Sequence, residues 1–149
     1  MAHPSSNAAY LDYQYDDSAK LRIRAETHQR FTVGEADFAA TELRHLDLRQ
    51  GQSLLDAGCG PGRLATGMPG SDVSVVGIDR SFGMVREAQL AAHRARFAQA
   101  DIGALPFGDA TFDRVAALGV LYHVREWRAA LQELRRVCRP RGGHIVASI

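Results

Sequence analysis

The sequence predicts an α/β fold with a parallel sheet, and two observations favour it. From Ser53 to the end of the chain, short apolar segments typical of buried strands alternate with segments of helical periodicity. A glycine-rich run at 54–62, LLDAGCGPG, joins the first of these strands to a helix. Such alternation is typical of parallel strands joined by right-handed crossovers, with helices covering both faces of the sheet.

The length and composition of the chain fit one globular domain. Its 149 residues are 46% hydrophobic and 23% charged, which is enough to bury a core. A net charge of +1 disfavours a chain that coats nucleic acid or an anionic membrane. No apolar run reaches the length of a membrane span, and the polar first residues do not resemble a secretion signal. Because Cys59 and Cys138 have no neighbour at metal-ligand spacing, we expect reduced thiols, no bound metal and a cytoplasmic location.

Three regions divide the chain. Residues 1–17 are polar and predict a tail. Residues 18–50 predict a helical cap, with one helix over 18–31 and another over 35–48. Residues 51–149 contain the alternating strands and helices, and we expect them to form the main domain.

Five strands are expected in the main domain. Each is a short segment with apolar residues, bounded by glycine, proline or polar residues. Their predicted bounds are Ser53–Ala57, Val73–Asp79, Arg96–Asp101, Phe112–Leu118 and His144–Ile149.

Three helices are expected between these strands. A short one follows the glycine-rich run and ends near Gly67. Ser81 is a suitable N-cap for a second helix that runs to Arg94. The third covers 126–138, where the apolar spacing predicts an inward face, and Pro140 and two glycines end it. The residues predicted to face inward are Trp127, Leu131, Leu134 and Val137.

The spacing of the glycines at 58, 60 and 62 separates two classes of ligand. A dinucleotide-binding loop has the pattern G-x-G-x-x-G, which would need glycine at position 63, where this chain has Arg63. An NAD-dependent oxidoreductase is therefore disfavoured. With Asp56 before the glycines, the run resembles motif I of the class I S-adenosylmethionine (SAM)-dependent methyltransferases. That resemblance implies SAM as the cofactor and a Rossmann-like sheet of strand order 3-2-1-4-5.

Two further carboxylates follow strands at positions typical of this family. Asp79 ends the second strand, where a carboxylate can accept hydrogen bonds from both ribose hydroxyls of an adenosine; a turn or capping aspartate is the alternative. Asp101 ends the third strand, where it can accept a bond from the adenine amino group while the N–H of Ile102 donates to the ring. Considered alone, Asp101 would be interpreted as a loop aspartate; the equivalent position of Asp79 one strand over is what favours a binding role. Met84 lies either against the adenosine or in the core.

Two later segments extend the resemblance over residues 50–149. Residues 104–124, ALPFGDATFDRVAALGVLYHV, resemble the family's next motifs, and residues 134–148 resemble the helix, turn and strand that close its cofactor-binding half. The backbone at Leu118 is expected to meet the amino-acid end of the cofactor. The cofactor-binding residues implied by the resemblance are Asp56, Gly58, Cys59, Gly60, Asp79, Arg80, Met84, Asp101, Ile102 and Leu118.

The best candidate for a catalytic base is His123, which follows the fourth strand in the segment LYHV. An imidazole titrates near neutral pH, as a base for a protonated acceptor requires. A histidine that packs and hydrogen bonds at the start of a loop is the alternative. Methyl transfer from a sulfonium also gains much of its rate from alignment in a dry site, so some acceptors need no base.

The end of the chain departs from the family pattern. The family sheet has seven strands, whereas this chain stops in or at the end of the fifth, so the last two are expected to be absent. The segment HIVASI would then form a sheet edge with unpaired backbone groups. A second copy or a partner chain is one way to cover that edge, and a truncated chain is another explanation.

The predicted function is SAM-dependent transfer of a methyl group to an oxygen, nitrogen or carbon of a small molecule. The alternative is a non-catalytic or truncated SAM-binding module that needs a partner chain or the missing strands. Nucleic acid is disfavoured as the acceptor, because the arginines at the end of the last helix are better explained as charges that complement its C-terminus.

Overall fold

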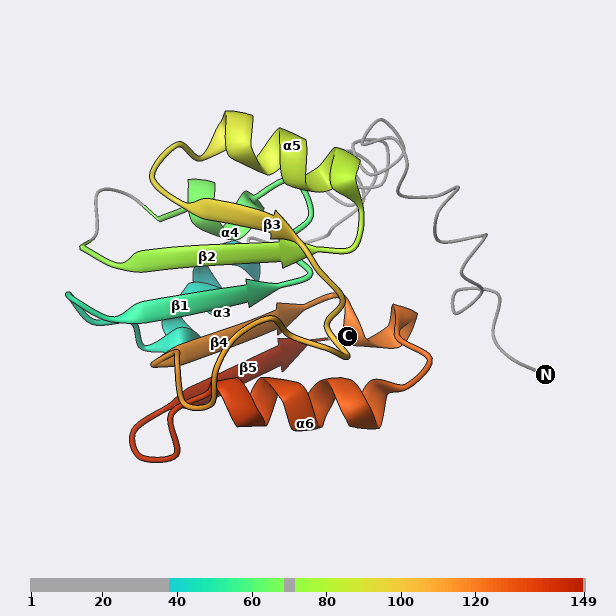
Figure 1. The fold of residues 1–149 in the computed structure, drawn as a ribbon. Coiled ribbons are helices and arrows are strands. Elements are labelled where there is room, and N and C mark those ends of the chain that lie inside the picture. The colour runs from blue at the N-terminus through green and yellow to red at the C-terminus, as the bar shows by residue number, and fades with distance from the viewer. Residues whose placement is uncertain (1–37, 69–71, 149) are drawn as a thin grey trace.

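The computed structural model describes residues 38–68 and 72–148, which form a five-stranded sheet with helices on both faces (Figure 1). All strand pairs in it are parallel, and the strand order is β3-β2-β1-β4-β5. This confirms the predicted Rossmann-like fold and its 3-2-1-4-5 order. The predicted tail at 1–17 and the predicted helix over 18–31 lie outside the described residues.

The strands lie within the predicted segments. They are β1 (Ser53–Ala57), β2 (Ser74–Asp79), β3 (Arg96–Gln99), β4 (Arg114–Leu118) and β5 (His144–Ser148). Strand β2 begins one residue later than predicted, and β3 and β4 are each two residues shorter than predicted. The predicted third strand reached Asp101, which lies in the loop after β3, and Phe112 forms an isolated bridge with Cys138 before β4 begins.

Four α-helices lie in segments that the sequence predicted to be helical: α3 (Phe38–Leu46), α4 (Arg63–Thr66), α5 (Phe82–Ala91) and α6 (Trp127–Val137). The 3-10 helix η2 (Leu121–His123) was not predicted. The predicted N-cap of α5 is confirmed, because Oγ of Ser81 accepts a hydrogen bond of 3.3 Å from the N–H of Met84. Among residues 38–68 and 72–148, no helix is long and apolar enough to cross a membrane.

Helices cover both faces of the sheet (Figure 1), and buried apolar clusters lie between the helices and the sheet on each face. On one face, Leu134 and Val137 of α6 pack in a buried cluster with Leu55 of β1. On the other face, Leu46 of α3 packs with the neighbouring strand residue Leu54. Successive residues of β1 therefore point to opposite faces, and both are buried, as in a sheet covered by helices on both sides.

A glycine in β2 makes room for the packing of α5. A Cβ on Gly77 would lie 2.5 Å from the ring of Phe97 in β3. That ring is buried in a cluster with Val85 and Ala88 of α5. Because Gly77 has no side chain, the ring of Phe97 can lie against β2 and pack beneath α5.

Two of the four residues predicted to face inward on α6 do not. Trp127 is 44% exposed and Leu131 is 37% exposed, whereas Leu134 and Val137 are fully buried. The buried residues of α6 belong to the cluster that packs against the sheet, and Leu131 is not part of that cluster. Trp127 belongs to the first turn, where the guanidinium of Arg128 lies 4.3 Å from its ring centroid. Apolar periodicity identified the helix and overestimated the width of its buried face.

Strand β5 is an edge strand within the described part of the chain. It pairs with β4 along its whole length and with no other described strand. Ile145 on this strand is 40% exposed. A partner chain or second copy at this edge stays a prediction.

Candidate functional site

The carboxyl ends of the five parallel strands lie at one edge of the sheet, where the arrows of Figure 1 end. The glycine-rich loop follows β1 there, a turn with Asp79 follows β2, the loop of Asp101 follows β3, and η2 follows β4. Parallel pairing brings together segments that are dispersed along the sequence. This edge is where open α/β sheets bind their ligands.

The glycine-rich loop has a backbone conformation that requires glycine. Gly58, Gly60 and Gly62 have positive φ angles of 82°, 52° and 84°. The N–H of Gly58 donates to the carbonyl of Ile78 in β2 at 2.8 Å. A Cβ on Gly58 would lie 2.5 Å from Cγ2 of Val120, whereas a Cβ on Gly60 would have no heavy atom within 4 Å. Gly58 therefore fits tightly against the end of β4, and Gly60 leaves open space beside the loop.

Both carboxylate oxygens of Asp79 accept hydrogen bonds from the backbone. Oδ2 accepts from the N–H of Gly60 at 2.9 Å, and Oδ1 accepts from the N–H of Ser81 at 2.8 Å. Burial raises the pKa of Asp79 above its usual range, although these N–H groups oppose the rise. Each carboxylate oxygen can accept more than one bond. Asp79 is thus fixed in place and can still accept two adjacent hydroxyl groups.

Asp56 is a buried carboxyl group at the end of β1. It is 3% exposed, and its strand is flanked by β2 and β4. Burial, and then the charge of Asp79, raise the pKa of Asp56 to about 7; Arg63 opposes this rise and Glu42 adds to it. A buried carboxylate costs free energy unless a cation or a donor compensates it. The group is therefore suited to a cationic ligand.

Three other residues of the predicted cofactor set differ in burial. Met84 is 1% exposed, so its side chain lies in the core, which was one of its two predicted positions. Cys59 is also buried; burial raises the pKa of its thiol, and Asp56 adds to this rise. Arg80 is exposed, and its carbonyl accepts a hydrogen bond of 2.9 Å from Nε2 of Gln99. A direct contact between any of these residues and a cofactor stays a prediction.

Asp101 and Asp79 follow neighbouring strands. The register pairs Asp79 with Gln99, so Asp101 lies just past the end of the adjacent strand. The Asp101 carboxylate is exposed, and its Oδ1 accepts a hydrogen bond of 2.7 Å from the N–H of Gly103. Ile102 is buried in the cluster on the α6 face. A ligand lying across both strand ends would meet the two carboxylates in turn.

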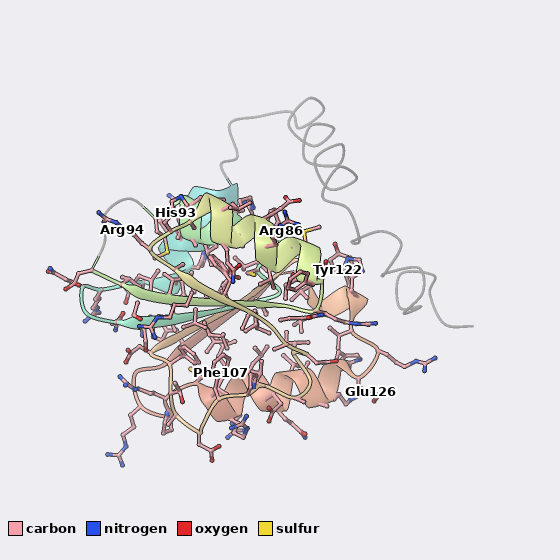
Figure 2. All side chains as sticks on the ribbon, turned by 45° about the horizontal axis from the view of Figure 1, so that its top comes forward. Arg86, His93, Arg94, Phe107, Tyr122 and Glu126 are labelled. Carbon is pink, nitrogen blue, oxygen red and sulfur yellow. The ribbon has the colours of Figure 1, made fainter. Side chains whose placement is uncertain are left out.

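A charged pair on α6 holds the loop that follows Asp101. Oε2 of Glu133 accepts from the N–H of Leu105 at 2.8 Å, and the guanidinium of Arg136 donates to the carbonyl of Phe107 at 2.8 Å. Figure 2 shows Phe107 beside α6. The two charged groups are 2.6 Å apart, and the hydrogen bond from Arg136 lowers the pKa of Glu133 to about 2. The loop position is thus set by a helix that is distant in sequence.

The segment after β4 contains the predicted base. Leu118 is half-buried at the end of that strand, and His123 is half-buried in η2. The ring centroid of His123 lies 3.9 Å from that of Tyr122. Figure 2 shows Tyr122 at the carboxyl edge of the sheet, at the opposite end from His93 and Arg94. His123 therefore lies on the edge that carries the glycine-rich loop.

One ion pair beside the site was not predicted from the sequence. Nη2 of Arg63 lies 3.0 Å from Oε2 of Glu42, which joins α3 to the residue that directly follows the glycine-rich loop. The Glu42 side chain is 18% exposed and that of Arg63 is 59% exposed. The sequence contained a basic residue after the last glycine and an acidic residue in a predicted helix, but no local spacing relates the two.

A comparison with protein families decides the class of this chain. The profile of the methyltransferase domain family matches residues 55–146, which is more than half of the chain. The chain belongs to this methyltransferase family. The match confirms the family resemblance that the sequence indicated. The cofactor of this class is S-adenosylmethionine, as the sequence predicted.

Two curated relatives agree with this assignment. A malonyl-[acyl-carrier protein] O-methyltransferase of Pseudescherichia vulneris is 33% identical over 117 residues, which are 78% of this chain and 45% of the relative. A 27-O-demethylrifamycin SV methyltransferase of Amycolatopsis mediterranei is 40% identical over 104 residues, which are 65% of this chain and 38% of the relative. This methyltransferase-family chain thus spans less than half the length of either relative.

One solved structure with this fold is described by a different reaction. The [4+2]-cyclase SpnF is 29% identical and superposes with a TM-score of 0.66, covering 74% of this chain and 43% of its own. A protein described as a cyclase therefore shares this architecture with methyltransferases. Fold alone does not determine which reaction such a sheet edge supports.

Proposed function

We propose that this chain binds SAM at the carboxyl edge of its sheet and transfers the methyl group to a small molecule. The observation that carries the proposal is the placement of two carboxyl groups around the glycine-rich loop: Asp79 bonded to Gly60, and Asp56 buried behind it. When bound, SAM supplies an electrophilic methyl group on a sulfonium sulfur. The residues of the chain bind this donor, orient it and exclude water from it.

Each end of the cofactor has a group of matching chemistry. Asp79 would accept both ribose hydroxyls, because each of its oxygens keeps an acceptor site beside its backbone bond. Asp101 would accept from the adenine amino group. Asp56 would face the ammonium of the amino-acid end, and the backbone at Leu118 would meet the same end. The open space beside Gly60 would let the ligand approach the loop backbone.

We favour an oxygen atom as the acceptor, because one relative described above is named an O-methyltransferase and the other is named for a 27-O-demethyl compound. His123 would take the proton of an acceptor hydroxyl as the carbon–oxygen bond forms. The ring of Tyr122 against that of His123 limits the orientations of the imidazole. A nitrogen or carbon atom of a small molecule is the alternative acceptor within this proposal.

Calorimetric titration tests the first half of the proposal. S-adenosylhomocysteine and SAM are titrated into the purified chain, with NADH as the control ligand. Micromolar binding of the first two and none of NADH is expected. A folded chain that binds neither would refute the proposed site.

A turnover assay tests the second half. SAM is incubated with the chain and panels of phenols, alcohols and carboxylic acids, and both S-adenosylhomocysteine and the mass of the acceptor are followed. Formation of a product heavier by one methylene unit is expected. Cofactor binding without turnover on any acceptor would favour the non-catalytic module, and reaction of an acceptor without loss of SAM would point to chemistry other than methyl transfer.

A further inference from the structure

The second half of α6 is hydrogen bonded to the loop between β3 and β4, which passes beside that helix (Figure 1). The N–H of Leu105 donates to Oε2 of Glu133 at 2.8 Å. The guanidinium of Arg136 donates to the carbonyls of Leu105 at 3.1 Å and Phe107 at 2.8 Å. Its backbone carbonyl accepts from the N–H of Ala110 at 2.9 Å. Two charged residues of one helix therefore hold successive backbone groups of this loop.

Glu133 and Arg136 are also bonded to each other. Nε and Nη2 of Arg136 donate to Oε1 and Oε2 of Glu133 at 2.6 Å and 2.8 Å, and Nη1 donates to Oδ1 of Asp109 at 2.8 Å. The Glu133 side chain is 22% exposed and that of Arg136 is 31% exposed. A bidentate pair between a guanidinium and a carboxylate fixes the orientation of both groups. The pair thus supports the loop in one arrangement.

The supported part of the loop begins directly after the turn that contains Asp101. In this turn the carbonyl of Asp101 accepts from the N–H of Ala104 at 3.1 Å, and Oδ1 accepts from the N–H of Gly103 at 2.7 Å. Leu105 is the next residue, and its N–H is the group bonded to Glu133. The position of the Asp101 turn is therefore tied to α6 through a short stretch of backbone.

Apolar packing attaches the same turn to the same helix. Ile102 and Leu105 are 7% and 5% exposed and belong to the buried cluster that contains Leu134 of α6. Because Ile102 directly follows Asp101, the burial of its side chain limits the orientation of its own backbone N–H. The carboxylate and the neighbouring N–H thus share one support.

We propose that Glu133 and Arg136 are positioning residues for recognition of the adenine base. The inference rests on the proposed function, in which Asp101 accepts from the adenine amino group; the N–H of Ile102 would donate to the adjacent ring nitrogen. Neither Glu133 nor Arg136 contacts the cofactor. They act through the loop backbone, because an acceptor and a donor that meet two neighbouring atoms of a base have to be held at a fixed separation and angle.

The inosine analogue of S-adenosylhomocysteine separates base recognition from general effects on the site. In S-inosylhomocysteine an oxo group replaces the amino group, and the adjacent ring nitrogen carries a hydrogen. The Asp101 carboxylate then faces an acceptor, and the N–H of Ile102 faces a donor. The ribose and the amino-acid end are unchanged. The ratio of the two affinities, called here the adenine preference, therefore measures recognition of the base.

The experiment compares three variants with two controls. Glu133→Ala removes the acceptor of the Leu105 N–H, Glu133→Gln keeps an acceptor oxygen without the charge, and Arg136→Ala removes the donors to the loop carbonyls. Arg135→Ala is the matched control, because Arg135 is exposed on the same helix. Val75→Ala shortens a buried side chain on the other face of the sheet and controls for lowered stability. Calorimetry measures both affinities, and thermal unfolding measures stability.

The wild type is expected to bind S-adenosylhomocysteine at least about tenfold more tightly than the inosine analogue. Glu133→Ala and Arg136→Ala should each reduce this adenine preference at least about threefold, because only S-adenosylhomocysteine has bonds to the turn that it can lose. Glu133→Gln should lie between the wild type and Glu133→Ala. Arg135→Ala and Val75→Ala should keep the full adenine preference, although Val75→Ala unfolds at a lower temperature.

The adenine preference also shows which proposal has failed. An unchanged preference in folded Glu133→Ala or Arg136→Ala overturns the inference, and so does an equal loss of affinity for both ligands. A reduced preference in Val75→Ala overturns it as well, since lowered stability would then be a sufficient cause. If neither alanine variant folds, Glu133→Gln decides: a reduced preference supports the inference and an unchanged one overturns it.

The wild type tests the proposed function separately. Binding of both ligands with equal affinity overturns this inference and the assignment of Asp101 to adenine, while the cofactor site itself is supported. Absence of S-adenosylhomocysteine binding by the folded wild type refutes the proposed function.

Discussion

The N–H of Gly60 donates a hydrogen bond of 2.9 Å to Oδ2 of Asp79, a residue 19 positions away in the sequence. The bond joins the loop after β1 to the turn after β2. Asp79 therefore stabilises the glycine-rich loop and also presents acceptor atoms at the carboxyl edge of the sheet. The two roles have separate experimental signatures.

The first prediction concerns ribose recognition by Asp79. Asp79→Ala is expected to weaken S-adenosylhomocysteine binding by about 1–3 kcal/mol, because two ligand hydroxyls lose their acceptor. Calorimetry measures the affinity, and thermal unfolding of the free protein measures the stability lost with the hydrogen bond from Gly60. Asp72→Ala, two residues before β2 begins, is the matched control and should leave affinity unchanged. Full affinity in the Asp79 variant would contradict its assignment.

The second prediction compares two glycines of one loop. Gly58→Ala is expected to destabilise the fold by about 1–3 kcal/mol beyond the cost of its positive φ, since the new Cβ would meet Val120 at 2.5 Å. Gly60→Ala is expected to destabilise the fold by about 1–2 kcal/mol, from the positive φ angle alone, because the new Cβ would meet no protein atom within 4 Å. The Gly60 variant should instead lose ligand affinity. Thermal unfolding and calorimetry distinguish the two, and equal stability losses would disprove the difference in packing.

The third prediction concerns the stability cost of Asp56. Its pKa is raised to about 7 in the folded protein, so the folded state binds a proton that the unfolded state has released. Stability of the free protein therefore falls as pH rises from about 4 to about 7. Asp56→Asn removes the ionisable group and is expected to be more stable than wild type by about 1–4 kcal/mol at pH 8. Denaturant unfolding at several pH values measures this, and a pH-independent difference would refute the cause.

The fourth prediction concerns acid stability of the loop after β3. The pKa of Glu133 is lowered to about 2, so its contribution is fully present above its unfolded value and is lost as pH falls through that range. Glu133→Gln should therefore lose less stability than wild type between about pH 5 and pH 2. Unfolding curves at each pH provide the measurement. Parallel losses in both proteins would show that the Glu133–Arg136 pair does not cause the acid sensitivity.

The fifth prediction tests His123 as the base. On an acceptor hydroxyl found in the turnover assay, His123→Asn is expected to lower kcat about a hundredfold or more while leaving S-adenosylhomocysteine affinity unchanged. His93→Asn is the matched control, since His93 lies at the opposite end of the domain from Tyr122 (Figure 2). Steady-state kinetics and calorimetry separate the two effects. Unchanged kcat would assign His123 to packing.

Local patterns were sufficient for the elements that border the site. The bounds of β1 agree with prediction, and the cap of α5 by Ser81 is the predicted one. These features depend on neighbouring residues: apolar runs for strands, a hydroxyl for the first N–H groups of a helix. Trp127 and Leu131 were predicted to be buried and are exposed. Periodicity shows which side of a helix is apolar, but it does not show how much of that side the sheet covers.

The sequence by itself determined the α/β order of the elements, the position of Asp79 at the end of a strand, and membership of the methyltransferase family. Each of these features depends on residues that lie close together in the sequence. Only the tertiary structure decided the burial of Asp56 and the pairing of Glu42 with Arg63. Both depend on which strands and helices pack around one carboxyl group, and electrostatic interactions act across the space between elements regardless of their separation in the chain.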